Sequence, residues 1–124
     1  MELEKLTESQ KSTEVYHQIG KCATIFSRLS SGMPKQLLLV VQKVHSSLDD
    51  ALEYVFRSGN EYPKEEKLKH LHLAQDSLFY QFNRIEYLVK SKGITIGQAN
   101  EFLVELREAH SQVLKWINSL RQKS

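Results

Sequence analysis

Apolar residues recur along the chain at alternating spacings of three and four, the period of amphipathic helices that lie side by side. The pattern is longest between Lys64 and Lys92, where no Gly or Pro interrupts it. Its positions are Leu68, Leu71, Gln75, Leu78, Phe82, Ile85 and Val89. A helix of this length extends roughly 40 Å. We therefore expect it to form a full wall of the fold.

The same stretch carries a second apolar stripe, Leu73, Tyr80 and Tyr87, about 200° around the helix from the first. The segment 37–41 is also apolar at every position, so its side chains cover more than one face of a helix. Apolar faces left over after a core is filled are typical of subunit contacts. We predict an oligomer interface at Leu38, Leu39, Val40, Leu73, Tyr80 and Tyr87.

Three further amphipathic segments predict helices at about 13–30, 34–58 and 96–121, beside the long one at 64–92. Residues 1–12 are charged and weakly patterned, and we expect a mobile or frayed segment there. A Thr7–Gln10 capping box is a weak signal, and a Thr95–Gln98 box is a stronger one. Gly59 and Gly93 are expected to end the second and third helices.

Short turns between four helices leave each helix antiparallel to the next. Residues 13–124 are therefore predicted to form an all-α, up-down-up-down antiparallel four-helix bundle in one domain. The chain of 124 residues, with 40% hydrophobic content, is long enough to bury a single core.

The cysteine content and the apolar runs of the sequence indicate the cellular location to expect. A single cysteine, Cys22, fits a reducing compartment, so we expect a cytoplasmic protein. The segment 1–11 lacks the apolar region of a signal peptide, and no apolar run approaches the roughly 20 residues that span a bilayer.

Catalytic and cofactor motifs are absent from the sequence, which contains no Gly-x-Ser-x-Gly elbow, no phosphate-binding Gly-rich loop and no Cys-x-x-Cys. We therefore predict a protein that is not an enzyme and uses no metal or cofactor. One alternative stays open. Glu14 and His17 have the Glu-x-x-His spacing of bundle metal sites, which would suit a metal-dependent enzyme.

Basic residues gather at one end of the predicted bundle, although the net charge is only +2. Phosphate groups are held by such clusters, so this end is a candidate nucleic-acid-binding surface. Its residues are Arg57, Lys64, Lys67, Lys69, His70, Arg121 and Lys123. Neighbouring glutamates at 61, 65 and 66 equally allow a merely solvated end.

The order of helices and turns resembles the accessory variability determinant (Avd) family of diversity-generating retroelements. The similarity covers nearly all the chain after Thr13, and it rests on Met33-Pro34-Lys35, the segment 48–55, the segment 92–95 and Trp116-Ile117. It implies a homopentameric barrel of four-helix bundles. It also implies partners: the element's reverse transcriptase and its template RNA, or other RNA or DNA, during mutagenic reverse transcription.

A more distant resemblance connects the chain to four-helix-bundle proteins encoded in intervening sequences of 23S ribosomal RNA genes. That resemblance implies an oligomeric interaction module with an unrelated partner, and it is the alternative function. The chain departs from the Avd pattern at residues 110–115, where the family has a small, glycine-containing run.

Overall fold

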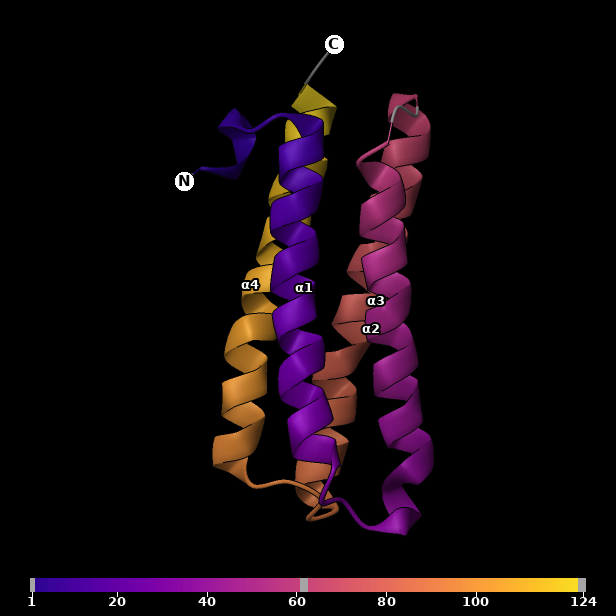
Figure 1. Cartoon of the computed structure of the whole chain (residues 1–124), viewed down its shortest axis with the longest axis vertical. Helices are drawn as coiled ribbons and strands as arrows, with labels where there is room; N and C mark the ends of the chain where they lie inside the picture. The colour runs from indigo at the N-terminus through magenta and orange to yellow at the C-terminus, as the bar shows by residue number, and fades with distance from the viewer. Residues whose placement is uncertain (1, 61–62, 123–124) are drawn as a thin grey trace.

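The computed structural model describes residues 2–60 and 63–122 and contains no strand within them. Four long helices make up most of the structure, with one short 3-10 turn before the first of them and another between the first and the second (Figure 1). Their bounds are η1 Leu3–Lys5, α1 Glu8–Ser30, η2 Lys35–Leu37, α2 Leu38–Ser58, α3 Lys64–Lys90 and α4 Ile96–Gln122. The predicted all-α four-helix bundle is thereby confirmed.

Each helix runs antiparallel to the next, and α4 packs back against α1 to close the arrangement (Figure 1). Helices α1 and α3 therefore lie on a diagonal of the bundle and run in the same direction. Their outward faces thus lie on different sides of the molecule.

The core is built mainly from the predicted helical stripes. The stripe of α3 is rotated from the prediction, because Ala74, Gln81 and Leu88 are buried while the predicted Leu68, Gln75, Phe82 and Val89 are half-buried. Leu71, Leu78 and Ile85 of α3 are fully buried, and Trp116 of α4 is buried with them. Phe26 of α1 packs edge-to-face against Phe102 of α4, with ring centroids 5.7 Å apart. Side chains of this size at these positions fill the space between the four helices and supply most of the apolar burial.

The first helix begins earlier than predicted. Helix α1 starts at Glu8, after Thr7 and Gln10 form a complete capping box. Lys11 and Ser12 are buried, so the last part of the expected mobile or frayed segment 1–12 is a helical turn inside the bundle. A capping box satisfies amide groups that would otherwise fray the helix end, which explains the difference.

Helices α2 and α3 end within three residues before Gly59 and Gly93, as expected, but neither glycine takes the left-handed conformation that often closes a helix. Gly59 ends α2 with φ −79°, not in the left-handed region, and after α3 Lys92 takes the positive φ of 62° rather than Gly93. Helix α2 begins at Leu38 because η2 forms first, after Pro34. The predicted Thr95–Gln98 box is confirmed by its two reciprocal hydrogen bonds of 2.9 and 3.1 Å.

Candidate nucleic-acid and subunit interfaces

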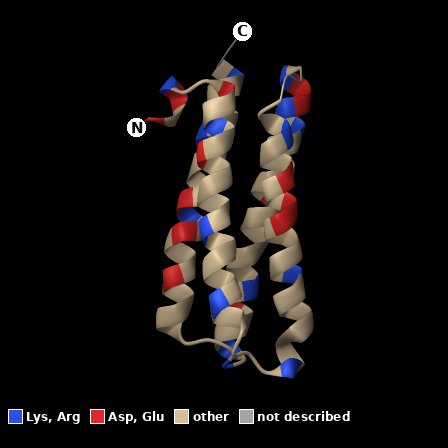
Figure 2. Ribbon diagram, viewed as in Figure 1, with Lys and Arg blue, Asp and Glu red and all other residues tan. Residues whose placement is uncertain are grey.

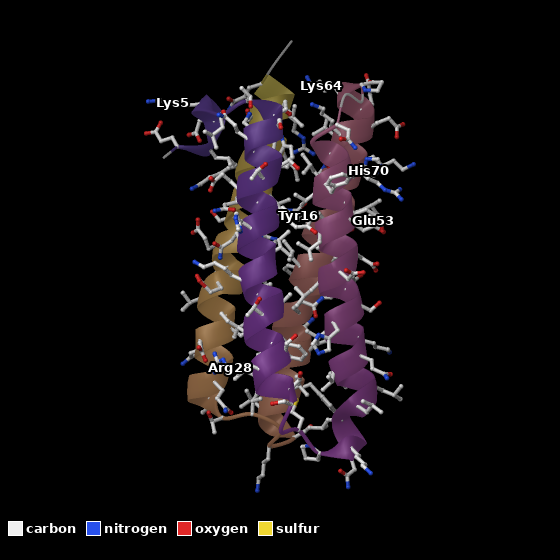
Figure 3. All side chains as sticks on the ribbon, viewed as in Figure 1. Lys5, Tyr16, Arg28, Glu53, Lys64 and His70 are labelled. Atoms are coloured by element: carbon white, nitrogen blue, oxygen red, sulfur yellow. The ribbon has the colours of Figure 1, made fainter. Side chains whose placement is uncertain are left out.

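The predicted basic surface lies at the end of the bundle where α2 gives way to α3, at the top of Figure 2. Lys64 and Lys69 of α3 are exposed there, and Lys64 and His70 are labelled in Figure 3. Arg57 is exposed as well, but its guanidinium binds the Glu53 carboxylate at 2.6 Å. Cations and carboxylates are therefore interleaved at this end.

Lys67 has a different position from its neighbours. Its side chain is only 12% exposed, and its ammonium lies 3.4 Å from Oε1 of Glu8. A lysine held in this way connects α3 to α1 across the diagonal of the bundle. The role of Lys67 is first of all structural, although it belongs to the predicted basic set.

Glu8 is the centre of a polar network that the sequence did not reveal. Lys11 is fully buried and donates hydrogen bonds to Glu8 at 3.0 Å and to Ser119 at 2.9 Å. The indole N–H of Trp116 donates to the other Glu8 oxygen at 3.0 Å. Buried ammonium groups are costly unless they are paired in this way, so the network holds α1, α3 and α4 in register.

Two opposing effects act on the Glu8 carboxyl group. Burial alone raises its pKa, but hydrogen bonds from Trp116 and Lys11 and the charges of Lys11 and Lys67 outweigh burial. The pKa of Glu8 is lowered from its ordinary value of 4.5 as a result. The carboxylate is therefore ionised at neutral pH, when the network is complete.

His70 and Arg121 are likewise engaged within the bundle end. The imidazole of His70 stacks on the ring of Tyr54 with centroids 6.4 Å apart. Arg121 is exposed and donates a hydrogen bond of 3.1 Å to Nε2 of His72. Lys123 lies outside the described residues. Among the described lysines of the predicted set, Lys64 and Lys69 are thus the exposed ones.

The predicted interface residues lie at two separate locations, the start of α2 and the outward face of α3. Leu38 and Leu39 are exposed at the start of α2, with Val40 half-buried beside them. Leu73, Tyr80 and Tyr87 are exposed along the outward face of α3, where Tyr80 has 57% of its surface accessible. Exposed tyrosines in a row are uncommon on a monomer surface, so this face remains the better candidate for a protein contact.

Sequence reasoning missed a hollow on another side of the bundle. It lies over Gly20 of α1 and is bounded by Tyr16 and by Phe56 of α2. Phe56 is 61% exposed although α2 supplies a continuous core stripe. The available signal was Gly20 itself, because a glycine in mid-helix costs helix stability and usually has a packing reason.

The alternative metal site is not assembled. Glu14 lines a cleft with Glu108 of α4 and η1, whereas His17 lines the hollow over Gly20. Among the residues that the structure describes, no group of three or more His, Cys, Asp or Glu side chains could hold a metal ion.

Cys22 is buried within the core of α1. Burial raises the pKa of its thiol to about 12, so the reactive thiolate is disfavoured there. Across the same described ranges, no helix is long and apolar enough to cross a membrane.

Comparisons of the chain with protein-family models, with curated proteins and with solved structures found no match.

Proposed function

We propose that this protein is a non-enzymatic accessory protein of a diversity-generating retroelement, acting in the cytoplasm as a homo-oligomer, with five copies implied by the Avd resemblance. It binds the element's reverse transcriptase and template RNA and thereby supports mutagenic reverse transcription. The resemblance supplies the biological setting. The observation that carries the proposal is the exposed row of Leu73, Tyr80 and Tyr87 on a helix whose other face is fully packed.

Oligomerisation gives the weakly charged end its function. Lys64 and Lys69 are exposed at the start of α3, and assembly of several copies around an axis repeats them at one end of the ring. Each lysine that neutralises a phosphate releases condensed counterions, so repeated contacts add up to useful affinity despite the net charge of +2. The bundle thus holds RNA beside the polymerase without taking part in its chemistry.

Light scattering during size-exclusion chromatography tests the assembly directly. We expect a homo-oligomer at micromolar concentration. A monodisperse monomer would contradict the proposal at its first step.

RNA binding is tested by reversing charge at the two exposed lysines. The variant Lys64→Glu/Lys69→Glu should bind RNA more weakly and lower the slope of log affinity against log salt by about one for each phosphate that is no longer neutralised. The matched control is Lys35→Glu/Lys92→Glu, because it reverses two exposed lysines at the opposite end of the bundle. Equal slopes for the two variants would rule out this end as the RNA surface.

The polymerase partner is tested by co-expression with the reverse transcriptase encoded beside the gene. We expect the two proteins to copurify and to retain the template RNA. An adjacent gene that encodes no reverse transcriptase would favour the intervening-sequence type of module instead.

A further inference from the structure

The outward face of α1 is hollowed over a length of several turns. The hollow has a volume of about 850 Å³, and apolar groups form most of its wall. A methyl group added at Gly20 would meet no atom within 4 Å, so the missing side chain leaves open space there. The residues that line the hollow include Thr13, Tyr16, His17, Lys21, Thr24 and Phe56.

The outward face of α3 is a ridge of exposed side chains and lies apart from the hollow. It carries Leu73, Tyr80 and Tyr87, with Asp76 and Asn83 between them, and all five are exposed. Because α1 and α3 are diagonal helices, one face cannot reach the other within a single copy. Each copy therefore presents one ridge and one hollow on separate helices, and Phe56 of α2 borders the hollow.

The ridge and the hollow lie at the same level along the bundle. The ion pair between Lys67 and Glu8 joins residues 59 positions apart in the sequence on α3 and α1. The two helices run in the same direction with the same rise per residue, so this offset holds along both. Tyr80 is consequently level with Lys21, beside Gly20.

The ridge carries a carboxylate at the level where the hollow carries basic side chains. Within the described part of the chain, the hollow is lined by Lys21 and His17 and by no carboxylate. Asp76 lies between Leu73 and Tyr80, level with His17, and has no ion pair within the same part of the chain. The contact of Lys21 with Glu105 is loose, at 3.8 Å, and leaves its side chain largely exposed.

We propose that the hollow on α1 of one copy receives the outward face of α3 from a second copy. Tyr80 fills the space over Gly20, and Asp76 faces Lys21 and His17. The contact is heterologous, because different surfaces meet. Since ridge and hollow are level, neighbouring copies are related without a shift along the bundle, and the repeated contact closes a ring when the rotation between copies divides a full turn.

The available area favours repeated contacts over an isolated pair. A strip one helix wide and about 40 Å long covers roughly 400 Å², whereas a stable pair buries about 800 Å² on each partner. A copy that uses both its ridge and its hollow buries about 800 Å² in total, with about half of that value at each contact. This inference rests on the proposed homo-oligomer and specifies which surfaces form it.

Paired cysteines test the register. The variant Thr24→Cys/Asn83→Cys places one thiol in the hollow and one on the ridge, at positions separated by the same offset as Glu8 and Lys67. We expect a short bis-maleimide reagent to link copies into a ladder of multimers. Thr13→Cys/Asn83→Cys is the matched control. Its two thiols are separated by about 16 Å along the bundle axis, so the reagent should not link them.

The outcomes separate this inference from the proposed function. An oligomer in which Thr24→Cys/Asn83→Cys yields no ladder overturns the interface and leaves the proposed function standing. Cross-linked dimers from Tyr80→Cys alone would also overturn it, because ridge would then meet ridge. A protein that is monomeric without any substitution overturns both.

Filling the hollow provides an independent test. Gly20→Trp should raise the concentration at the midpoint of dissociation by about tenfold or more, whereas Val104→Trp, on the exposed surface of α4, should leave it unchanged. Asp76→Lys should weaken assembly, and addition of Lys21→Asp should restore it. Unfolding curves identify any variant that fails to fold, and equal midpoints for the Gly20 and Val104 variants contradict the interface.

Discussion

Glu8 at the start of α1 accepts a hydrogen bond from the indole of Trp116, 108 residues later in α4, at 3.0 Å. The same carboxylate pairs with Lys11 and Lys67. One short side chain thus connects the first turn of the fold to its last helix and to α3. The stability of the bundle depends on this carboxylate for the same reason.

Replacement of Glu8 by alanine should destabilise the protein by about 3 kcal/mol, because it leaves the buried ammonium of Lys11 without its carboxylate. Urea unfolding at pH 7 measures the effect. Glu65→Ala is the matched control, since Glu65 is an exposed acidic residue in the first turn of α3. It should cost only the few tenths of a kcal/mol expected from the helix dipole. Similar losses for both variants would contradict the role of the network.

The lowered pKa of Glu8 predicts a loss of stability in acid. The folded state holds the carboxylate ionised below 4.5, the ordinary pKa, so the unfolded state takes up protons first as the pH falls. The contribution of Glu8 is present above about pH 4.5 and disappears as the pH falls through the lower pKa of the folded state. Between about pH 3 and pH 6, the free energy of unfolding should change less with pH in Glu8→Gln than in the unsubstituted protein. An unchanged pH dependence would exclude Glu8 as the cause.

Cys22 should resist modification in the folded protein. Its thiol is buried and its pKa is raised to about 12, so very little thiolate forms at pH 8. We expect a thiol reagent to react fully in urea and very slowly in buffer, and the ratio of the two rates to follow the stability of the fold. Rapid labelling without denaturant would show that this part of α1 opens locally.

Two glycines should respond oppositely to alanine. Gly20→Ala should stabilise the protein by about 0.5–1 kcal/mol, because its Cβ meets no neighbour and alanine favours the helix. Gly59→Ala should destabilise it by about 1–3 kcal/mol, because the added Cβ would overlap the side chain of Ser12. Thermal unfolding of both variants measures the difference. A neutral Gly59→Ala would mean that α1 and the end of α2 separate easily.

The helices and their order could be predicted from the sequence because both depend on local physics. Leu71, Leu78 and Ile85 recur every seven residues and so predict a buried helical face, and the Thr95–Gln98 box marks a helix start. Short turns then leave few ways to arrange four helices. The exposure of Tyr80 and Tyr87 followed from the same period, since one helix cannot bury opposite faces in one core.

Only the tertiary structure decided which charged residues are available to a partner. Lys64 and Lys67 are three positions apart in one lysine-rich turn, yet Lys67 is held by Glu8 from another helix. The buried pairing of Lys11 and the hollow over Gly20 depend equally on side chains distant in sequence. The spacing of apolar residues predicts which face of each helix packs into the core, whereas ion pairs and hollows depend on contacts between helices. The sequence by itself therefore determined the bundle, and the packing of α1 against its neighbours decided the surfaces it offers.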